Sequence, residues 1–117
     1  MSRSKGLSEA EVMRKVRFEV GQHPERAVLW RNNVGTAMHF DKRTGTIHPV
    51  EYGLAPGSSD LVGLTCEGQF VALELKRERG GRVEPEQEMY LELVRKLGGI
   101  AGVARSAAEA KRVLGWR

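Results

Sequence analysis

Apolar positions recur at helical spacing near the start of the chain. Val12, Val16 and Val20 are four residues apart, which places them on one face of a helix. Ser8 precedes this stripe and Glu11 follows three residues later, which is the pattern of a capping box. The first regular element is therefore expected to be an amphipathic helix that begins just after Ser8.

Two further segments have the same spacing. Pro85 suits the first turn of a helix, and the apolar stripe that follows it ends at Gly98-Gly99; the stripe consists of Tyr90, Leu91, Val94 and Leu97. Ser106 and Glu109 form a second capping-box pattern, which predicts a short helix ending near Leu114. A second and a third helix are therefore expected in the C-terminal third of the chain.

The remaining apolar runs are short and typical of strands. Strands are expected over residues 27–33, 60–65, 70–76 and 100–104, and a hairpin is expected from residues 36–40 and 46–48 around the turn-like segment 41–45. Helices interleaved with strands indicate an α/β fold with a mixed sheet and helices packed on it. At 117 residues, the chain 1–117 is expected to form a single domain.

Composition and charge exclude several classes of protein. No apolar run approaches the ~18 residues that a membrane span needs, so we expect a cytoplasmic protein that makes no contact with a membrane. The single cysteine, Cys66, excludes an internal disulfide framework and a cysteine-based zinc site. The net charge of +4 is compatible with a polyanionic partner but is too small to name one.

The strand over residues 70–76 carries the first sign of chemistry. Side chains alternate between the two faces of a strand, so Val71, Leu73 and Leu75 share one face while Glu74 and Lys76 lie on the other. A carboxylate and an ammonium thus lie side by side at the end of an otherwise apolar strand. Such a pair is often a solvated ion pair, and it is costly to bury unless it is paired or binds something.

The preceding strand begins with a second carboxylate, Asp60. If the short Glu67-Gly68 turn makes these strands antiparallel neighbours, Asp60 lies beside Glu74 and Lys76. Carboxylate oxygens are the ligands that Mg²⁺ prefers, and a nearby lysine can orient an attacking water and offset developing charge. The simpler alternative is that Asp60 is only a turn residue.

Two polar residues on helices point to the same region. Gln87 precedes Tyr90, Leu91 and Val94 by three, four and seven positions, so it lies on the apolar face of its helix. Glu9 has the same relation to the first apolar stripe, whereas the neighbouring Glu11 points away from it and serves the capping box. The alternative for each residue is that a side chain near a helix end simply reaches solvent.

Together these motifs resemble the VRR-NUC family of the PD-(D/E)xK nuclease superfamily. The resemblance is carried by Glu9, the segments 30–35, 57–61 and 74–76, Gln87, and the final strand with its short helix. The superfamily's name places a proline before the aspartate, where this chain has Ser59. The fold that the resemblance implies is a restriction-endonuclease-like core, a mixed central sheet flanked by helices in αβββαβ order.

The resemblance also implies roles for individual residues. Asp60, Glu74 and the backbone carbonyl of Leu75 would bind Mg²⁺ or Mn²⁺, with Glu9 as an auxiliary carboxylate. Lys76 would be the catalytic lysine and Gln87 would orient it. The choice of Glu9 over Glu11 depends on the helical-face argument alone.

The activity implied by the resemblance is metal-dependent endonucleolytic cleavage of DNA. Stand-alone, virus-encoded members of the family resemble Holliday-junction resolvases, which are homodimers that cut branched DNA such as four-way junctions. DNA, a divalent metal ion and a second copy of the chain are therefore the expected partners.

Contacts with the nucleic acid are expected near the ends of two strands. The candidate residues are Arg31, Asn33, Arg77, Arg79 and Arg82. For the three arginines after the catalytic strand, a solvated charged loop is an equally good interpretation.

Other functions remain open at this point. A non-catalytic nucleic-acid-binding module on the same fold is one alternative, although such a module would be expected to lose one of Asp60, Glu74 and Lys76. A general or sequence-biased DNA nuclease without junction preference is another. A restriction-type enzyme is disfavoured, because the chain has no room for a separate recognition domain.

Overall fold

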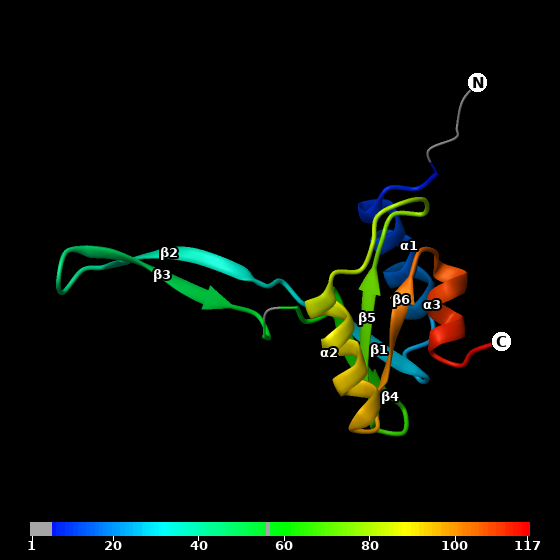
Figure 1. The fold of residues 1–117 in the computed structure, drawn as a ribbon. Coiled ribbons are helices and arrows are strands. Elements are labelled where there is room, and N and C mark those ends of the chain that lie inside the picture. The colour runs from blue at the N-terminus through cyan, green and yellow to red at the C-terminus, as the bar shows by residue number, and fades with distance from the viewer. Residues whose placement is uncertain (1–5, 56) are drawn as a thin grey trace.

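A computed structural model describes residues 6–55 and 57–117 of the chain. Its elements are α1 (Glu9–Gly21), β1 (Ala27–Arg31), β2 (Gly35–Asp41), β3 (Thr46–Tyr52), β4 (Leu61–Thr65), β5 (Phe70–Leu75), α2 (Pro85–Lys96), β6 (Ile100–Ala104) and α3 (Ala107–Val113) (Figure 1). Each expected helix and strand is present, with boundaries that differ by a few residues. No helix in these two ranges is both long and apolar enough to cross a membrane.

Four strands form the central sheet in the order β1-β4-β5-β6. β4 is antiparallel to β1 and β5, and β5 is parallel to β6. The Glu67-Gly68 turn thus makes β4 and β5 antiparallel neighbours, as expected, with Leu61 opposite Leu73. Because β2 and β3 lie outside this sheet, the core elements follow the αβββαβ order, with α3 added at the end. The architecture is a mixed α/β restriction-endonuclease-like core.

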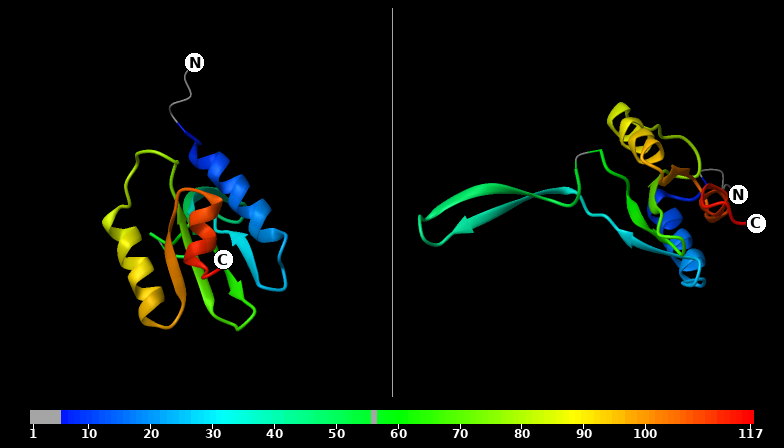
Figure 2. Two further views of the ribbon diagram at one scale, coloured as in Figure 1. Left: turned by 90° about the vertical axis from the view of Figure 1, so that its right-hand side faces the viewer. Right: turned by 90° about the horizontal axis from the view of Figure 1, so that it is seen from below.

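The alternation in β5 assigns each face of the sheet to different helices. Val71, Leu73 and Leu75 pack with residues of α1 and α3 in the larger core cluster, which includes Val12, Val16, Val20, Ala107 and Ala110. Ala72 faces the other side, where it packs with Leu91 and Val94 of α2. Figure 2 shows the central sheet between α2 on one side and α1 with α3 on the other. Glu74, on the Ala72 face, therefore points toward α2.

The helix caps confirm most of the sequence analysis and correct one part of it. Ser8 and Glu11 form the expected capping box of α1. Ser106 caps α3 through the Glu109 amide, but Glu109 Oε1 accepts from the Arg105 amide, at 2.7 Å, and not from the Ser106 amide. The prediction of a second capping box is therefore wrong, because the Glu109 carboxylate accepts from the Arg105 N–H group just after β6.

β2 and β3 form a separate two-stranded sheet that projects from the core; we call it the arm (Figures 1 and 2). Every residue of β3 and five of the seven in β2 are exposed. The arm explains why the radius of gyration is 16.5 Å, whereas a compact domain of this length has about 13 Å. The hairpin was expected from the sequence, but its separation from the central sheet was not.

Candidate active site

Asp60 lies immediately before β4, and its side chain is fixed to the neighbouring strand. Its Oδ2 atom accepts a hydrogen bond of 2.8 Å from the backbone amide of Leu75 in β5. This bond crosses from the start of one strand to the end of the other, where Glu74 and Lys76 are located. The structure therefore brings Asp60 beside both residues, as the antiparallel pairing predicted.

Glu74 is the one charged residue in the described ranges that is almost completely buried, with 2% of its surface exposed. Its Oε2 atom accepts a 2.7 Å hydrogen bond from Gln87 Nε2 and lies 3.5 Å from Lys76 Nζ. Its Oε1 atom is buried without any hydrogen-bond partner in the described structure. One half of this carboxylate is thus satisfied and the other half has no donor, which is costly unless a cation or a proton occupies it.

Gln87 connects the cluster to the start of α2. Its Oε1 atom accepts from Lys76 Nζ at 3.3 Å and from the Glu84 amide at 2.8 Å, which completes a capping box that the sequence analysis did not identify. Its Nε2 atom holds Glu74. The inward-facing interpretation of Gln87 is confirmed, and the geometry explains it: one side chain caps the helix and contacts both charged groups at the end of β5.

The environment of Glu74 favours its protonated form. Burial, followed by the adjacent carboxylate of Asp60, raises the pKa of Glu74 from 4.5 to about 7, although the charge of Lys76 acts in the opposite direction. Two carboxyl groups held side by side repel each other when both are ionised. The cluster is therefore short of positive charge when Asp60 and Glu74 are both deprotonated.

The donor set fits a hard divalent cation. The cluster offers carboxylate oxygens from Asp60 and Glu74, and the buried Glu74 Oε1 atom has no competing donor. In the described ranges no three His, Cys, Asp or Glu side chains form a complete metal cage. An ion here would therefore take its other ligands from the backbone, solvent or substrate, which is usual for Mg²⁺.

Asn32 fixes the loop that leads into Asp60, a role that the sequence analysis did not assign. Its Nδ2 atom donates to Ser58 Oγ and to the Ser59 carbonyl, both at 2.8 Å, and its backbone amide donates to the Asp60 carbonyl at 2.8 Å. Ser59, at the position of the superfamily's proline, is buried and donates its hydroxyl to the Leu61 carbonyl. Hydrogen bonds thus shape the backbone where a pyrrolidine ring would otherwise do so.

Glu9 and Asp60 line one pocket, whereas Glu11 does not contribute to it. This polar pocket has a volume of about 570 Å³ and is lined by Glu9, Ala10, Met13, Arg14, Arg17, Arg31, Asn32, Asn33, Val34, Ser58 and Asp60. Glu11 is engaged in the cap of α1 and lines a different depression. Of the two carboxylates, Glu9 is the one that the fold places on the Asp60 side of α1.

The five arginine and asparagine residues expected to contact nucleic acid fall into two groups. Arg31 and Asn33 line the polar pocket with Asp60. Arg77 and Arg79 instead border a depression near Glu11, and Arg82 forms an ion pair with Glu84 at 3.7 Å. Sequence reasoning also missed Arg14 and Arg17, which lie on the polar-pocket side of α1. These two arginines are three residues apart, and this helical spacing was the sequence signal that could have identified them as one basic face of the helix.

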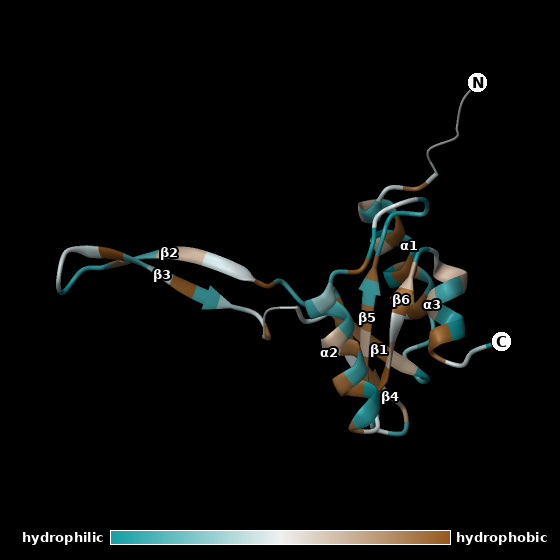
Figure 3. Ribbon diagram, in the orientation of Figure 1, coloured by the Kyte–Doolittle hydropathy of each residue, from teal (hydrophilic) through white to brown (hydrophobic). Residues whose placement is uncertain are grey.

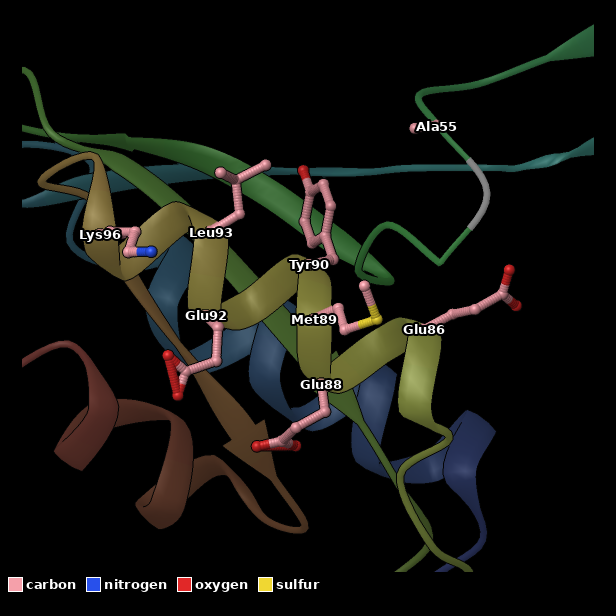
Figure 4. A pocket seen from close by; sticks show the side chains of 8 residues that line it. All are labelled: Ala55, Glu86, Glu88, Met89, Tyr90, Glu92, Leu93 and Lys96. Atoms are coloured by element: carbon pink, nitrogen blue, oxygen red, sulfur yellow. The ribbon is translucent and has the colours of Figure 1, made fainter.

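A larger and mostly apolar pocket of about 650 Å³ lies on the outer side of α2 (Figure 4). Met89, Tyr90 and Leu93 line it together with Ala55 near the base of the arm. Tyr90 and Leu93 point to the side on which Ala55 lies, while Glu88 points the opposite way (Figure 4). This pocket contains none of the clustered residues, so it is separate from the candidate active site.

The fold and the cluster define a restriction-endonuclease-like protein with paired carboxylates and a lysine at one end of the central sheet. A comparison with family models matches residues 10–108 to the VRR-NUC domain. The chain therefore belongs to the VRR-NUC family, a nuclease-type family whose substrate is DNA. A search of curated proteins found no match.

Proposed function

We propose that this protein is a divalent-metal-dependent endonuclease that hydrolyses DNA phosphodiester bonds. The observation that carries the proposal is the arrangement of Asp60, Glu74, Lys76 and Gln87. Two carboxylates adjoin there, a lysine amine lies 3.5 Å from one of them, and a buried carboxylate oxygen has no donor in the described structure. A purely structural ion pair would not need the second carboxylate, which raises the pKa of Glu74 and so destabilises its charged form.

Asp60, Glu74 and the Leu75 carbonyl would hold Mg²⁺ or Mn²⁺, with Glu9 contributing from the polar pocket. When bound, the ion supplies Lewis-acid stabilisation of the phosphoryl oxygens. Lys76 holds its amine at the site, where it orients the attacking water and stabilises charge that develops on the phosphoryl group. Gln87 keeps that amine and Glu74 in register through its two hydrogen bonds.

A cleavage assay with matched variants tests this proposal. Asp60→Asn, Glu74→Gln and Lys76→Met should each lower the cleavage rate by about 10²–10⁴-fold, because each removes a charge that acts at the reacting group. Glu67→Gln is the control, since Glu67 is an exposed carboxylate in the turn at the other end of β4 and β5. The proposal is wrong if cleavage survives all three substitutions or persists in excess chelator.

Calorimetry distinguishes the nuclease from a non-catalytic binding module. Titration of Mn²⁺ into the native protein should give a binding signal that Asp60→Asn and Glu74→Gln remove and Glu67→Gln retains. A module that only binds nucleic acid would give no such signal. DNA binding without any metal signal would favour that second function.

We also propose that the working form is a homodimer and that the arm joins the two copies. Met38, Phe40 and Ile47 are each more than half exposed on the arm, and Phe40 lies opposite Ile47 on the same face. Figure 3 shows these apolar segments away from the core. A two-stranded hairpin alone is marginally stable in water, so this apolar face requires a partner.

The partner surface that fits the arm is the outer side of α2 on a second copy. That side exposes Met89, Leu93 and Leu97, and the pocket beside them is bordered by three acidic residues, Glu86, Glu88 and Glu92, and by one basic residue, Lys96. The turn of the arm carries Lys42 and Arg43 against one acidic residue, Asp41, which lies 3.8 Å from Arg43. The turn therefore has a net positive charge that complements the acidic border of α2, and the apolar faces complement each other as well. The turn lies far from α2 of its own chain (Figure 1), so an α2 helix that contacts the turn must belong to another copy.

Light scattering coupled to size-exclusion chromatography tests the dimer. The native chain should be dimeric, Phe40→Ser/Ile47→Ser should be monomeric, and His39→Ser/His48→Ser, on the opposite face of the arm, should remain dimeric. A monomeric native chain at the highest workable concentration, or no effect of the Phe40→Ser/Ile47→Ser change, would exclude this role of the arm.

The dimer bears on the choice of substrate. A symmetric dimer presents two identical sites, which suits paired cuts in the two strands of a four-way junction. We therefore propose branched DNA as the preferred substrate. The native protein should cleave a four-way junction faster than a linear duplex of the same sequence, and the monomeric arm variant should lose this preference; equal rates on both substrates would indicate a general nuclease.

A further inference from the structure

Three arginines line the polar pocket, and none of them belongs to the proposed catalytic residues. Ala10, Met13, Arg14 and Arg17 recur at i, i+3, i+4 and i+7, so they form one side of α1 and line the pocket together. The buried face of the same helix is formed by Val12, Val16 and Val20. Helical periodicity thus directs two arginines toward Asp60, while the apolar face holds the helix on the sheet.

A third arginine enters the pocket from the central sheet. Arg31 is the last residue of β1, and Asn33 follows it in the pocket lining. Asn32 between them is bound to Ser58 and to the backbone of residues 59 and 60, which connects this strand end to the segment that carries Asp60. The positions of Arg31 and Asp60 are therefore fixed relative to each other by the backbone.

None of the three guanidinium groups, those of Arg14, Arg17 and Arg31, forms an ion pair with a carboxylate of the described residues. Hydrogen bonds from Ser8 lower the pKa of Glu11, and the charge of Arg14 adds a smaller effect in the same direction. Three arginines face two carboxylates, Glu9 and Asp60, in the lining of the pocket, so a metal ion held by those carboxylates would leave an excess of positive charge that favours an anionic ligand.

We infer that the polar pocket binds the phosphate backbone of the DNA strand next to the phosphate that is cut, through Arg14, Arg17 and Arg31. This inference rests on the proposed nuclease function, because it places the strand beside Asp60. Arginine suits the role, since its planar fork forms two hydrogen bonds with one phosphate. Backbone contacts of this kind position a strand without reading its sequence, which agrees with selection of DNA by shape.

The Arg77-Arg79 segment is the competing candidate for this role. Arg105 donates hydrogen bonds to the carbonyl groups of Arg77, Gly80 and Gly81, so this loop is tied to the end of β6. Arg77 and Arg79 border a depression that also contains Glu11, and Asp60 does not line it. The polar pocket is thus the basic surface that is continuous with Asp60.

Binding measured without cleavage tests the inference. The affinity for a fluorescent four-way junction is measured by anisotropy in excess chelator over a range of salt concentrations. Arg14→Ala/Arg17→Ala should weaken binding by about tenfold or more and reduce the slope of log K against log salt by about 1–2, because each lost phosphate contact removes ~0.9 from that slope. Arg14→Lys/Arg17→Lys should retain most of the slope, because the charge remains.

A matched control separates the pocket from overall charge. Lys15→Ala/Arg112→Ala also removes two positive charges, from exposed residues of α1 and α3 that do not line the pocket. If this control weakens binding and lowers the slope as much as Arg14→Ala/Arg17→Ala does, or if the pocket variant binds like the native protein, the inference is overturned. Circular dichroism and Mn²⁺ calorimetry on each variant show that the fold and the metal site are retained.

The two proposals fail in different ways. If the nuclease proposal is wrong, Asp60→Asn and Glu74→Gln leave cleavage intact. If only the pocket inference is wrong, those variants lose cleavage while Arg14→Ala/Arg17→Ala retains native junction affinity and salt slope.

Discussion

The burial of Glu74 predicts that the metal-free protein is stabilised when this residue loses its charge. Its pKa is about 7 in the folded chain against 4.5 for an exposed carboxyl group. Because the folded-state value is raised, the native protein binds the Glu74 proton more tightly than the unfolded chain does. The free energy of unfolding therefore falls as the pH rises from about 4.5 to about 7 and then levels off.

Glu74→Gln measures this effect, because glutamine has nearly the same shape and no charge. Its side-chain oxygen can still accept from Gln87 Nε2, which donates to Glu74 at 2.7 Å. A shift of this size corresponds to at most about 3.4 kcal/mol, at 1.36 kcal/mol for each pKa unit, and to about 2 kcal/mol after screening by water at the mouth of the site. In chelator at pH 8 the variant should be more stable by roughly that amount, which raises the melting temperature by roughly 8–12 °C.

Urea unfolding followed by circular dichroism, in chelator from pH 4.5 to 8.5, provides the measurement. The difference between Glu74→Gln and the native protein should vanish at the acid end, where Glu74 is protonated. Saturating Mn²⁺ at pH 8 should reverse the order, since a ligand that binds only the folded native protein stabilises it. A variant that is less stable at pH 8, or equally stabilised at both ends of the range, would refute the reasoning.

The remaining predictions concern the groups around this carboxylate. Asn32→Ala should lower the free energy of unfolding by about 1–3 kcal/mol in urea titrations, because partly buried groups in the Ser58-Ser59 segment lose their donor. It should also weaken Mn²⁺ binding, and unchanged calorimetry would show that the segment holds Asp60 without Asn32. Glu9→Gln should reduce the cleavage rate at fixed metal concentration, whereas Glu11→Gln, which keeps the capping pattern of α1, should leave the rate unchanged. The opposite result would show that Glu11 is the auxiliary carboxylate. Gln87→Leu should reduce the cleavage rate by at least tenfold and change its pH profile, because Lys76 and Glu74 lose their common hydrogen-bond partner. An unchanged pH profile would show that Gln87 only caps α2 and does not position these two groups.

Local periodicity determined most of the elements and part of the site. The alternation in residues 70–76 was sufficient to place Glu74 and Lys76 on one face, and the short turn around Glu67-Gly68 was sufficient to bring Asp60 to the same end of the neighbouring strand. Helical spacing likewise placed Gln87 inward. These inferences held because strand alternation, short turns and helical faces depend on residues that are close in the sequence.

Tertiary structure decided the features that depend on distant partners. The hairpin of β2 and β3 has ordinary strand patterning, and only the pairing of β1 with β4 left it outside the central sheet. Ser106 caps α3 as predicted, but the Glu109 carboxylate accepts from the backbone amide of Arg105, which lies just after β6. Asn32 and the arginines of α1 gained their surroundings from segments about 14 to 46 residues away along the chain. The sequence alone thus indicated the residues of the proposed site, whereas packing between distant segments decided which of them are buried, which are held in place and which surface adjoins them.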